Sequence, residues 1–150
     1  MRSLLAAGLF GVAFAAAAVG VRSTAADDKD QHAGHAAHFV ACAKECHDCA
    51  LMCDTCAAHC ANMLAEGKKD HLASLRTCQD CSAICTAAAC VTAKAGPFSD
   101  AICTACAEAC KRCGAECDKH GHDEHMKKCA EECRKCEKAC REMLEHVGHK

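Results

Sequence analysis

Cysteine occupies the positions along this chain where an amphipathic helix normally carries leucine or isoleucine. From Cys42 to Cys60 the sequence reads CAKECHDCALMCDTCAAHC, with successive cysteines separated by 4, 3, 4, 3 and 4 residues. Steps of three and four average 3.5 residues, so these side chains fall on one stripe of a helix. Charged and small residues fill the remaining positions. The pattern predicts a long helix with thiols along its buried face.

Three further cysteine stretches follow, separated by helix-breaking residues. Gly67, the Gly96-Pro97 pair and Gly121 interrupt the pattern, and between them lie mostly good helix formers. The later stretches carry Cys78, Cys81, Cys85 and Cys90, then Cys103, Cys106, Cys110, Cys113 and Cys117, and finally Cys129, Cys133, Cys136 and Cys140. All keep the same spacing except at Cys90, which falls off its stripe.

The four stretches predict an all-α protein, an antiparallel up-down-up-down four-helix bundle with a cysteine-lined core. Each helix should have roughly 20 to 28 residues. The turns between them are short, which makes neighbouring helices antiparallel. Polar residues after the breakers are candidate N-caps, namely Asp70 for the second helix, Ser99 or Asp100 for the third and Asp123 for the fourth.

Histidine and methionine continue the stripes beyond the cysteines. In an antiparallel bundle the following residues gather at one end: Met63, His71 (reached through Leu75), His120, His122, His125 and Met126. At the opposite end the stripes reach His38 or Phe39 and Met143. We expect a thiol-lined tube with imidazole and thioether groups at one mouth. Four other histidines, His47, His59, His146 and His149, are expected on the surface.

An apolar run precedes the cysteine stretches. Leu4–Val21 is followed by the small residues Ser23-Thr24-Ala25-Ala26, which predicts a signal peptide over residues 1–26. A retained anchor helix is the alternative, because a run of this length is near the lower limit for crossing a bilayer. Residues 27–36 are polar and predicted to be a flexible histidine-containing segment, and residues 37–150 form the bundle domain. We therefore expect an exported protein, periplasmic or secreted, with no membrane segment once processed.

Charge and composition narrow the function. Loss of Arg2 and Arg22 with the signal leaves 16 basic against 20 acidic residues, a net charge of −4 with neutral histidine. An acidic chain without Trp or Tyr is a poor candidate for binding nucleic acid. The processed chain has only twelve Phe, Leu, Ile and Val residues against 19 cysteines, too few for an ordinary core. The cysteines must therefore form the core themselves or bind something that stabilises the fold in place of an apolar core.

Three interpretations of the aligned thiols are open. Packing alone would give a thin core, because a buried free cysteine is a small hydrophobe. A disulfide-stabilised exported structural protein suits the signal, but nineteen is an odd number and each stripe offers many equivalent partners. Soft-metal binding is the third, because thiolates select Cu(I), zinc or iron–sulfur clusters. We favour Cu(I), since a CxxxC pair can hold a soft ion between consecutive helical turns.

These features resemble the cysteine-rich four-helix-bundle copper-storage family, over roughly Ala37 to His146. The resemblance rests on the CxxxCxxC stripes and the His/Met-rich end. It implies a protein, not an enzyme, that stores many Cu(I) ions on interior thiolates, takes them up and releases them at an open end, and assembles as a homo-oligomer, a tetramer. The predicted metal ligands are Cys42, Cys46, Cys49, Cys53, Cys56, Cys60, Cys78, Cys81, Cys85, Cys103, Cys106, Cys110, Cys113, Cys117, Cys129, Cys133, Cys136, Cys140, Met63, His71, His120, His122 and Met126.

Overall fold

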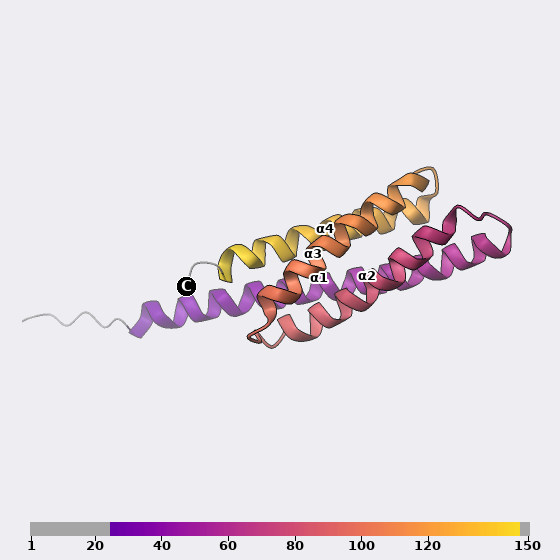
Figure 1. The fold of residues 1–150 in the computed structure, drawn as a ribbon. Coiled ribbons are helices and arrows are strands. Elements are labelled where there is room, and N and C mark those ends of the chain that lie inside the picture. Colours follow the sequence, from indigo (N-terminus) through magenta and orange to yellow (C-terminus); the bar gives the residue numbers. More distant parts are fainter. Residues whose placement is uncertain (1–24, 148–150) are drawn as a thin grey trace, which may run out of the picture.

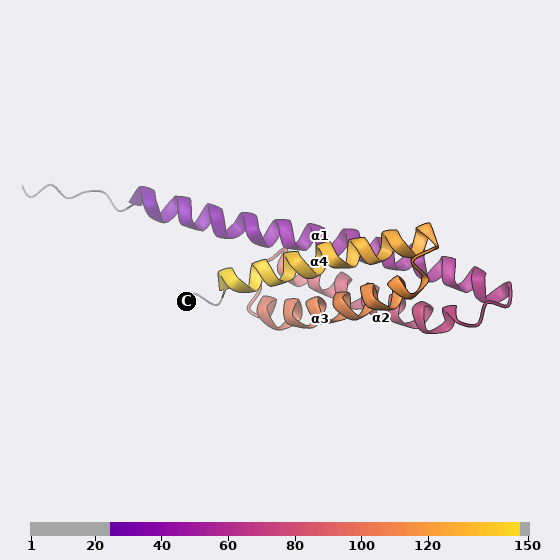
Figure 2. The ribbon, with the colours of Figure 1, turned by 90° about the horizontal axis from the view of Figure 1, so that it is seen from above.

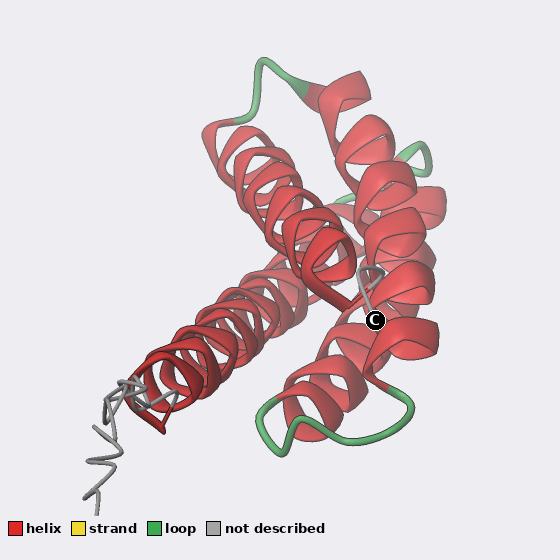
Figure 3. Ribbon diagram, turned by 90° about the vertical axis from the view of Figure 1, so that its left-hand side faces the viewer, coloured by secondary structure: helices red, strands yellow, loops and turns green. Residues whose placement is uncertain are grey.

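Four long helices run back and forth along one axis. The computed structural model describes residues 25–147, with α1 at Ala25–Ala65, α2 at His71–Thr92, α3 at Ser99–Cys117 and α4 at Glu124–Val147, and a short 3-10 helix η1 at Asp118–His120. Helix α1 packs beside α2 and α4, and α3 completes the bundle between the same two neighbours (Figures 1 and 2). The loops lie at the ends of the helices (Figure 3). The predicted antiparallel four-helix bundle is confirmed.

Helix α1 is longer than the sequence pattern suggested. It begins at Ala25 and includes residues 27–36, for which we expected no regular structure. The segment contains alanine and other helix formers, which allow the helix to extend upstream of the first cysteine. Figure 1 shows α1 projecting past the end of α4. The predicted signal peptide lies outside the described residues, apart from Ala25 and Ala26.

The start of α4 is fixed by Asp123, as predicted. Its Oδ1 atom accepts hydrogen bonds from the backbone N–H of His125 at 2.8 Å and of Met126 at 3.3 Å. These bonds satisfy two of the four amide groups that a helix leaves unpaired at its N-terminus. The same carboxylate therefore sets the position at which Met126 enters the core.

The other helix starts differ in detail from the prediction. Asp70 precedes α2 at the N-cap position, but its side chain makes no capping hydrogen bond. Phe98, rather than Ser99 or Asp100, occupies the N-cap position of α3. The chain leaves α1 through Gly67, whose φ of +89° lies in the left-handed region that glycine adopts without strain. These turns keep neighbouring helices antiparallel.

Sulfur takes the place of branched aliphatic side chains in the core. Eighteen of the nineteen cysteines are buried, together with alanines such as Ala107 and Ala130 and the methionines Met126 and Met143. Cys90 alone is exposed, in agreement with its position off the stripe. Large apolar residues such as Leu75 and Ile84 are only partly buried against this core. Among the described residues, no helix has the length and apolarity needed to cross a membrane.

Candidate metal centre

The cysteine stripes of diagonally opposed helices meet along the axis of the bundle. Helices α1 and α3 are not neighbours around the bundle, yet their sulfur atoms come into contact across its centre. The steps are 4, 3 and 4 residues in α1 and 3, 4 and 3 residues in α3, so the two stripes stay in register and contact repeats at every turn. The Sγ–Sγ pairs are Cys42–Cys103 at 3.8 Å, Cys46–Cys106 at 3.9 Å, Cys49–Cys110 at 3.8 Å and Cys53–Cys113 at 4.0 Å.

Helices α2 and α4 complete these contacts to groups of four thiols. Within each group the Sγ atoms all lie within 4.8 Å of one another, and every member is buried. Neighbouring groups share cysteines, so the thiols form one continuous ladder rather than separate sites. Five of these quartets are Cys46/Cys106/Cys136/Cys140, Cys49/Cys53/Cys81/Cys133, Cys49/Cys85/Cys110/Cys136, Cys53/Cys113/Cys129/Cys133 and Cys56/Cys78/Cys117/Cys129.

The distances between sulfur atoms suit bridging metal ions rather than disulfides. The shortest Sγ–Sγ contact, between Cys85 and Cys110, is 3.5 Å, and the sulfur atoms of each quartet lie within 4.8 Å of one another. A disulfide bond is about 2.05 Å long. Three sulfurs around one ion, with bonds of about 2.3 Å as in zinc thiolates, would lie about 4.0 Å apart. All nineteen cysteines are free in the structure, so the alternative of a disulfide scaffold finds no support.

The pKa values of the buried thiols are shifted in both directions: a hydrogen bond with Cys117 lowers the pKa of Cys113 to about 6, whereas the pKa of other thiols is raised. Burial raises the pKa of the Cys60 thiol to about 12, and the neighbouring Cys56 adds to this rise. Contact with Cys140, together with burial, likewise raises the pKa of Cys103 to about 12. A cation that binds at thiols of raised pKa must displace their protons, and its charge then compensates the thiolates that burial alone would disfavour.

Met126 connects the thiol ladder to the histidine-rich end of the bundle. Its side chain is fully buried, and its Sδ atom lies 3.5 Å from Sγ of Cys56 and 3.7 Å from Sγ of Cys60. His71 and His120 are also buried at this end, and their rings stack with centroids 4.1 Å apart. The structure therefore brings together three of the five predicted non-cysteine ligands, as the antiparallel topology required.

The imidazole of His71 has one ring nitrogen that forms no hydrogen bond with any group in the described part of the chain. Its Nδ1 atom is buried and has no hydrogen-bond partner. Burial lowers the pKa of His71, and the neighbouring His120 lowers it further. Both effects favour the neutral imidazole, which is the form that binds metals. An unpaired buried nitrogen is costly, and a metal ion would satisfy it.

Two histidines that the spacing rule left out of the ligand set belong to this end as well. His59 was expected on the surface, but its Nε2 lies 2.7 Å from Oδ2 of Asp123 and its ring stacks on His125 with centroids 4.8 Å apart. His125 Nε2 is buried without a partner. The stripe rule missed His59 because it adjoins Cys60. His59 lies four residues before Met63, and this helical spacing could have placed His59 at the histidine-rich end.

Met63 and His122 lie at the margin of the cluster. Met63 is half-buried, and its Sδ contacts the Nζ of Lys68 at 3.1 Å. His122 is exposed, with its ring centroid 6.4 Å from that of His120. Ser74, rather than Leu75, takes the buried stripe position beside His71, and its hydroxyl has no partner.

Comparisons with known proteins agree with this geometry. Residues 13–145 match the family model for copper storage proteins. The cysteine-rich protein YhjQ of Bacillus subtilis is 38% identical over 104 residues, which cover 69% of this chain and 93% of that protein. A cytosolic copper storage protein from Streptomyces lividans, solved with five coppers, superposes with a TM-score of 0.68 at 36% identity and covers 75% of this chain and 96% of its own. The Cu(I)-bound copper storage protein BsCsp3 gives a TM-score of 0.63 at 34% identity, covering 71% and 98%.

The expectation of an exported, periplasmic or secreted protein is contradicted by these comparisons, because the similar S. lividans protein is described as cytosolic. The family match also begins at residue 13, inside the apolar run that suggested a signal peptide. Alanine-rich apolar sequence alone was a poor guide to compartment.

Proposed function

The chain belongs to the copper storage protein family, and from that premise we propose that it holds its Cu(I) on the eighteen buried cysteines of the four stripes. It is a storage protein that binds multiple Cu(I) ions. The observation that carries the ligand assignment is the overlap of the thiol quartets, in which Cys49, Cys53 and Cys129 each serve two groups. Shared sulfurs allow bridging between ions, so capacity can reach on the order of 10 to 20 ions per chain.

Binding exchanges protons for copper without changing the oxidation state of either partner. Each thiol that becomes a ligand loses its proton to solvent, and the S–H bond is replaced by a bond from sulfur to Cu(I). The soft thiolate favours Cu(I) over harder cations. Helices α1 to α4 supply the scaffold that holds the sulfurs at contact distance before any ion arrives.

We assign uptake and release to the histidine-rich end. The buried imidazoles of His71 and His120 lie at that end of the bundle, and Met126 lies against Cys56 and Cys60. An ion that binds the unpaired Nδ1 of His71 can pass to the Met126 thioether and from there to the first thiols. Neutral nitrogen and thioether ligands bind less tightly than thiolates, so they suit transfer rather than retention.

The same burial supports our proposal of a storage role without catalysis. A catalytic metal site keeps one position open for substrate, whereas these thiols surround the axis from all four helices and are closed to solvent. For assembly we propose a homo-tetramer, as the family resemblance implies. Val40 and Leu51 support self-association: they are 61% and 62% exposed, and they lie about three turns apart on one side of α1.

Anaerobic titration of the fully reduced chain tests the stored amount. Cu(I) is added against a chelating competitor, and bound copper is counted once the competitor begins to take up metal. We expect saturation on the order of 10 to 20 ions per chain. Saturation at one or two ions would overturn the assignment of the quartets as the store.

A further inference from the structure

The end of the bundle opposite the histidine cluster carries a second group of soft ligands. His38 of α1 stacks on His146 of α4, with ring centroids 3.7 Å apart and planes inclined by 25°. Cys42 lies one helical turn after His38, and Met143 lies one turn before His146. Helices α1 and α4 are packed neighbours, so imidazole, thiol and thioether come together between them.

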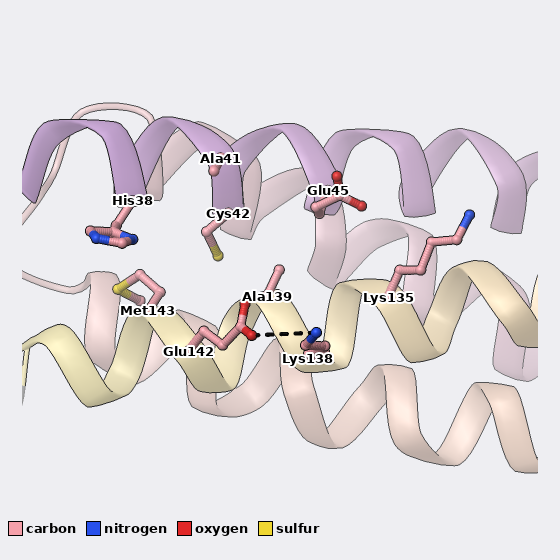
Figure 4. A pocket seen from close by; sticks show the side chains of 9 residues that line it. All are labelled: His38, Ala41, Cys42, Glu45, Lys135, Lys138, Ala139, Glu142 and Met143. Atoms are coloured by element: carbon pink, nitrogen blue, oxygen red, sulfur yellow. Dashed lines mark ion pairs between the residues drawn. The ribbon is translucent and has the colours of Figure 1, made fainter. Parts of the chain in front are cut away.

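A cavity of about 420 Å³ opens at this place between α1 and α4. His38 and Cys42 line it from α1, and Met143 lines it from α4. In Figure 4 the His38 ring and the Met143 sulfur face each other, and the Cys42 sulfur points into the same space. Cys42 and Met143 are only 2% and 1% exposed, whereas His38 is exposed, so sulfur forms the floor and imidazole the rim.

The charged residues at the rim balance one another. They are Glu45, Lys135, Lys138 and Glu142, and Lys138 pairs with Glu142 at 3.6 Å. Two acids against two bases give the cavity no net attraction for a hard anion or a hard cation. The soft donors of its floor and rim are therefore the feature that selects a ligand, and imidazole, thioether and thiol together suit a soft metal ion.

The floor of the cavity is continuous with the thiol ladder. Cys42 Sγ lies 3.8 Å from that of Cys103 and 3.9 Å from that of Cys140, which form the last thiol layer at this end. On the α2 side the end is closed, because Ala88 and Thr92 are fully buried and the Thr92 hydroxyl lies 3.3 Å from the Cys103 sulfur. Access to the last layer is therefore open on the α1–α4 side.

We propose that His38, Cys42, Met143 and His146 form a second Cu(I) site, through which ions enter or leave the ladder at the end far from His71. When the ion binds, the Cys42 thiol releases its proton to solvent as the copper–sulfur bond forms, and copper remains Cu(I). The proposal rests on the storage function, but it is independent of the histidine cluster at the other end.

Imidazole nitrogen NMR tests the site directly. Histidine-labelled, fully reduced chain is titrated anaerobically with Cu(I) until the ladder is saturated, and the ¹⁵N shifts of each ring are followed. We expect the His38 and His146 resonances to shift, while those of His47, an exposed histidine on α1, stay in place. Unchanged His38 and His146 resonances at saturation would overturn the site. The buried variant Met143→Leu keeps the side-chain volume and should weaken the shift.

Loading kinetics test access through this end. His71→Ala/His120→Ala removes two rings from the first end, and adding His38→Ala/His146→Ala removes both rings from the second. We expect Cu(I) loading from a chelate to be about tenfold slower in the quadruple variant than in the double variant. The His47→Ala variant should load at the wild-type rate. Equal loading rates in the double and quadruple variants would refute access through the end that carries His38 and His146. A wild-type capacity of only one or two ions would instead refute the storage function.

Discussion

At the residue scale, the step of three and four residues decided which sulfurs face the axis. Cys90 follows Cys85 by five residues and is exposed, whereas the other eighteen cysteines are buried. The same rule could not choose between Ser74 and Leu75, because both lie within the allowed step from Cys78. The structure buries the smaller serine beside His71 and leaves leucine at the edge. The spacing of the cysteines carries no information about this choice.

Cys90→Ser and Cys133→Ser form a matched pair that tests the assignment of ligands. Cys90 is exposed, so its serine variant should bind as much Cu(I) as the wild type. Cys133 belongs to two quartets, so its loss should lower the capacity by at least one ion and weaken the neighbouring sites. Copper counted at saturation under reducing conditions checks both variants. Equal capacities would show that Cys133 is not a ligand.

Met126→Leu separates transfer from storage. Leucine keeps a similar volume and should cost less than about 1.5 kcal/mol of stability, but it removes the sulfur that contacts Cys56 and Cys60. We expect loading through the histidine-rich end to slow severalfold while the final copper content falls by at most one ion. Stopped-flow mixing with a Cu(I) chelate gives the rate, and circular dichroism confirms the fold. An unchanged rate would exclude Met126 from the transfer path.

At the scale of the helices, one carboxylate links the end of a helix to the arrangement of the ligands. Asp123 caps α4 and also holds His59, so it orients a histidine of one helix and the first turn of another. The cap was visible in the sequence, because an acidic residue followed the break at Gly121. The contact with His59 was not, since it depends on the axial offset between α1 and α4.

Asp123→Ala should destabilise the fold by about 0.5–2 kcal/mol, the usual cost of losing an N-cap. Burial raises the Asp123 pKa, but hydrogen bonds from His59 and from the His125 and Met126 amides outweigh it, so the pKa is lowered overall. This stabilisation is present above the ordinary carboxyl pKa and is lost as pH falls through the lowered value. The difference between variant and wild type should therefore shrink in acid.

Denaturant unfolding of the metal-free chain at several pH values measures this effect. Asp70→Ala is the matched control, because Asp70 precedes α2 but makes no capping hydrogen bond. Its cost should be smaller than that of Asp123→Ala. Equal losses for the two variants would mean that the Asp123 cap does not stabilise α4.

At the scale of the whole molecule, the bundle followed from repetition. Four stripes with the same step, separated by three breaks, predicted four antiparallel helices, and the exposure of Cys90 agrees with its position off the stripe. The upstream extent of α1 could not be predicted in this way, because residues 27–36 carry no cysteine to mark a buried face. The compartment was missed for a related reason: the apolar run lies outside the pattern that determines the fold.

The metal-free and copper-loaded forms should differ clearly in stability. A core of small thiols buries little apolar area, whereas ions bound only by the folded chain stabilise it by mass action. We expect the Cu(I)-loaded form to melt at a higher temperature than the reduced metal-free form. Differential scanning calorimetry under anaerobic conditions checks this, with added Mg²⁺ as a control for charge alone. Equal melting temperatures would contradict a core held together by metal.

The sharing of sulfurs between quartets also determines how the contents of the bundle can be reached. An ion in the middle of the ladder has no direct route to solvent, because the cysteines of the inner layers are fully buried among the four helices, and it moves outward only by exchanging one shared sulfur for the next. The stored ions then enter and leave in sequence along the axis rather than independently of one another. The ions nearest an end leave first, and the time needed to empty the chain grows with the number of layers behind them.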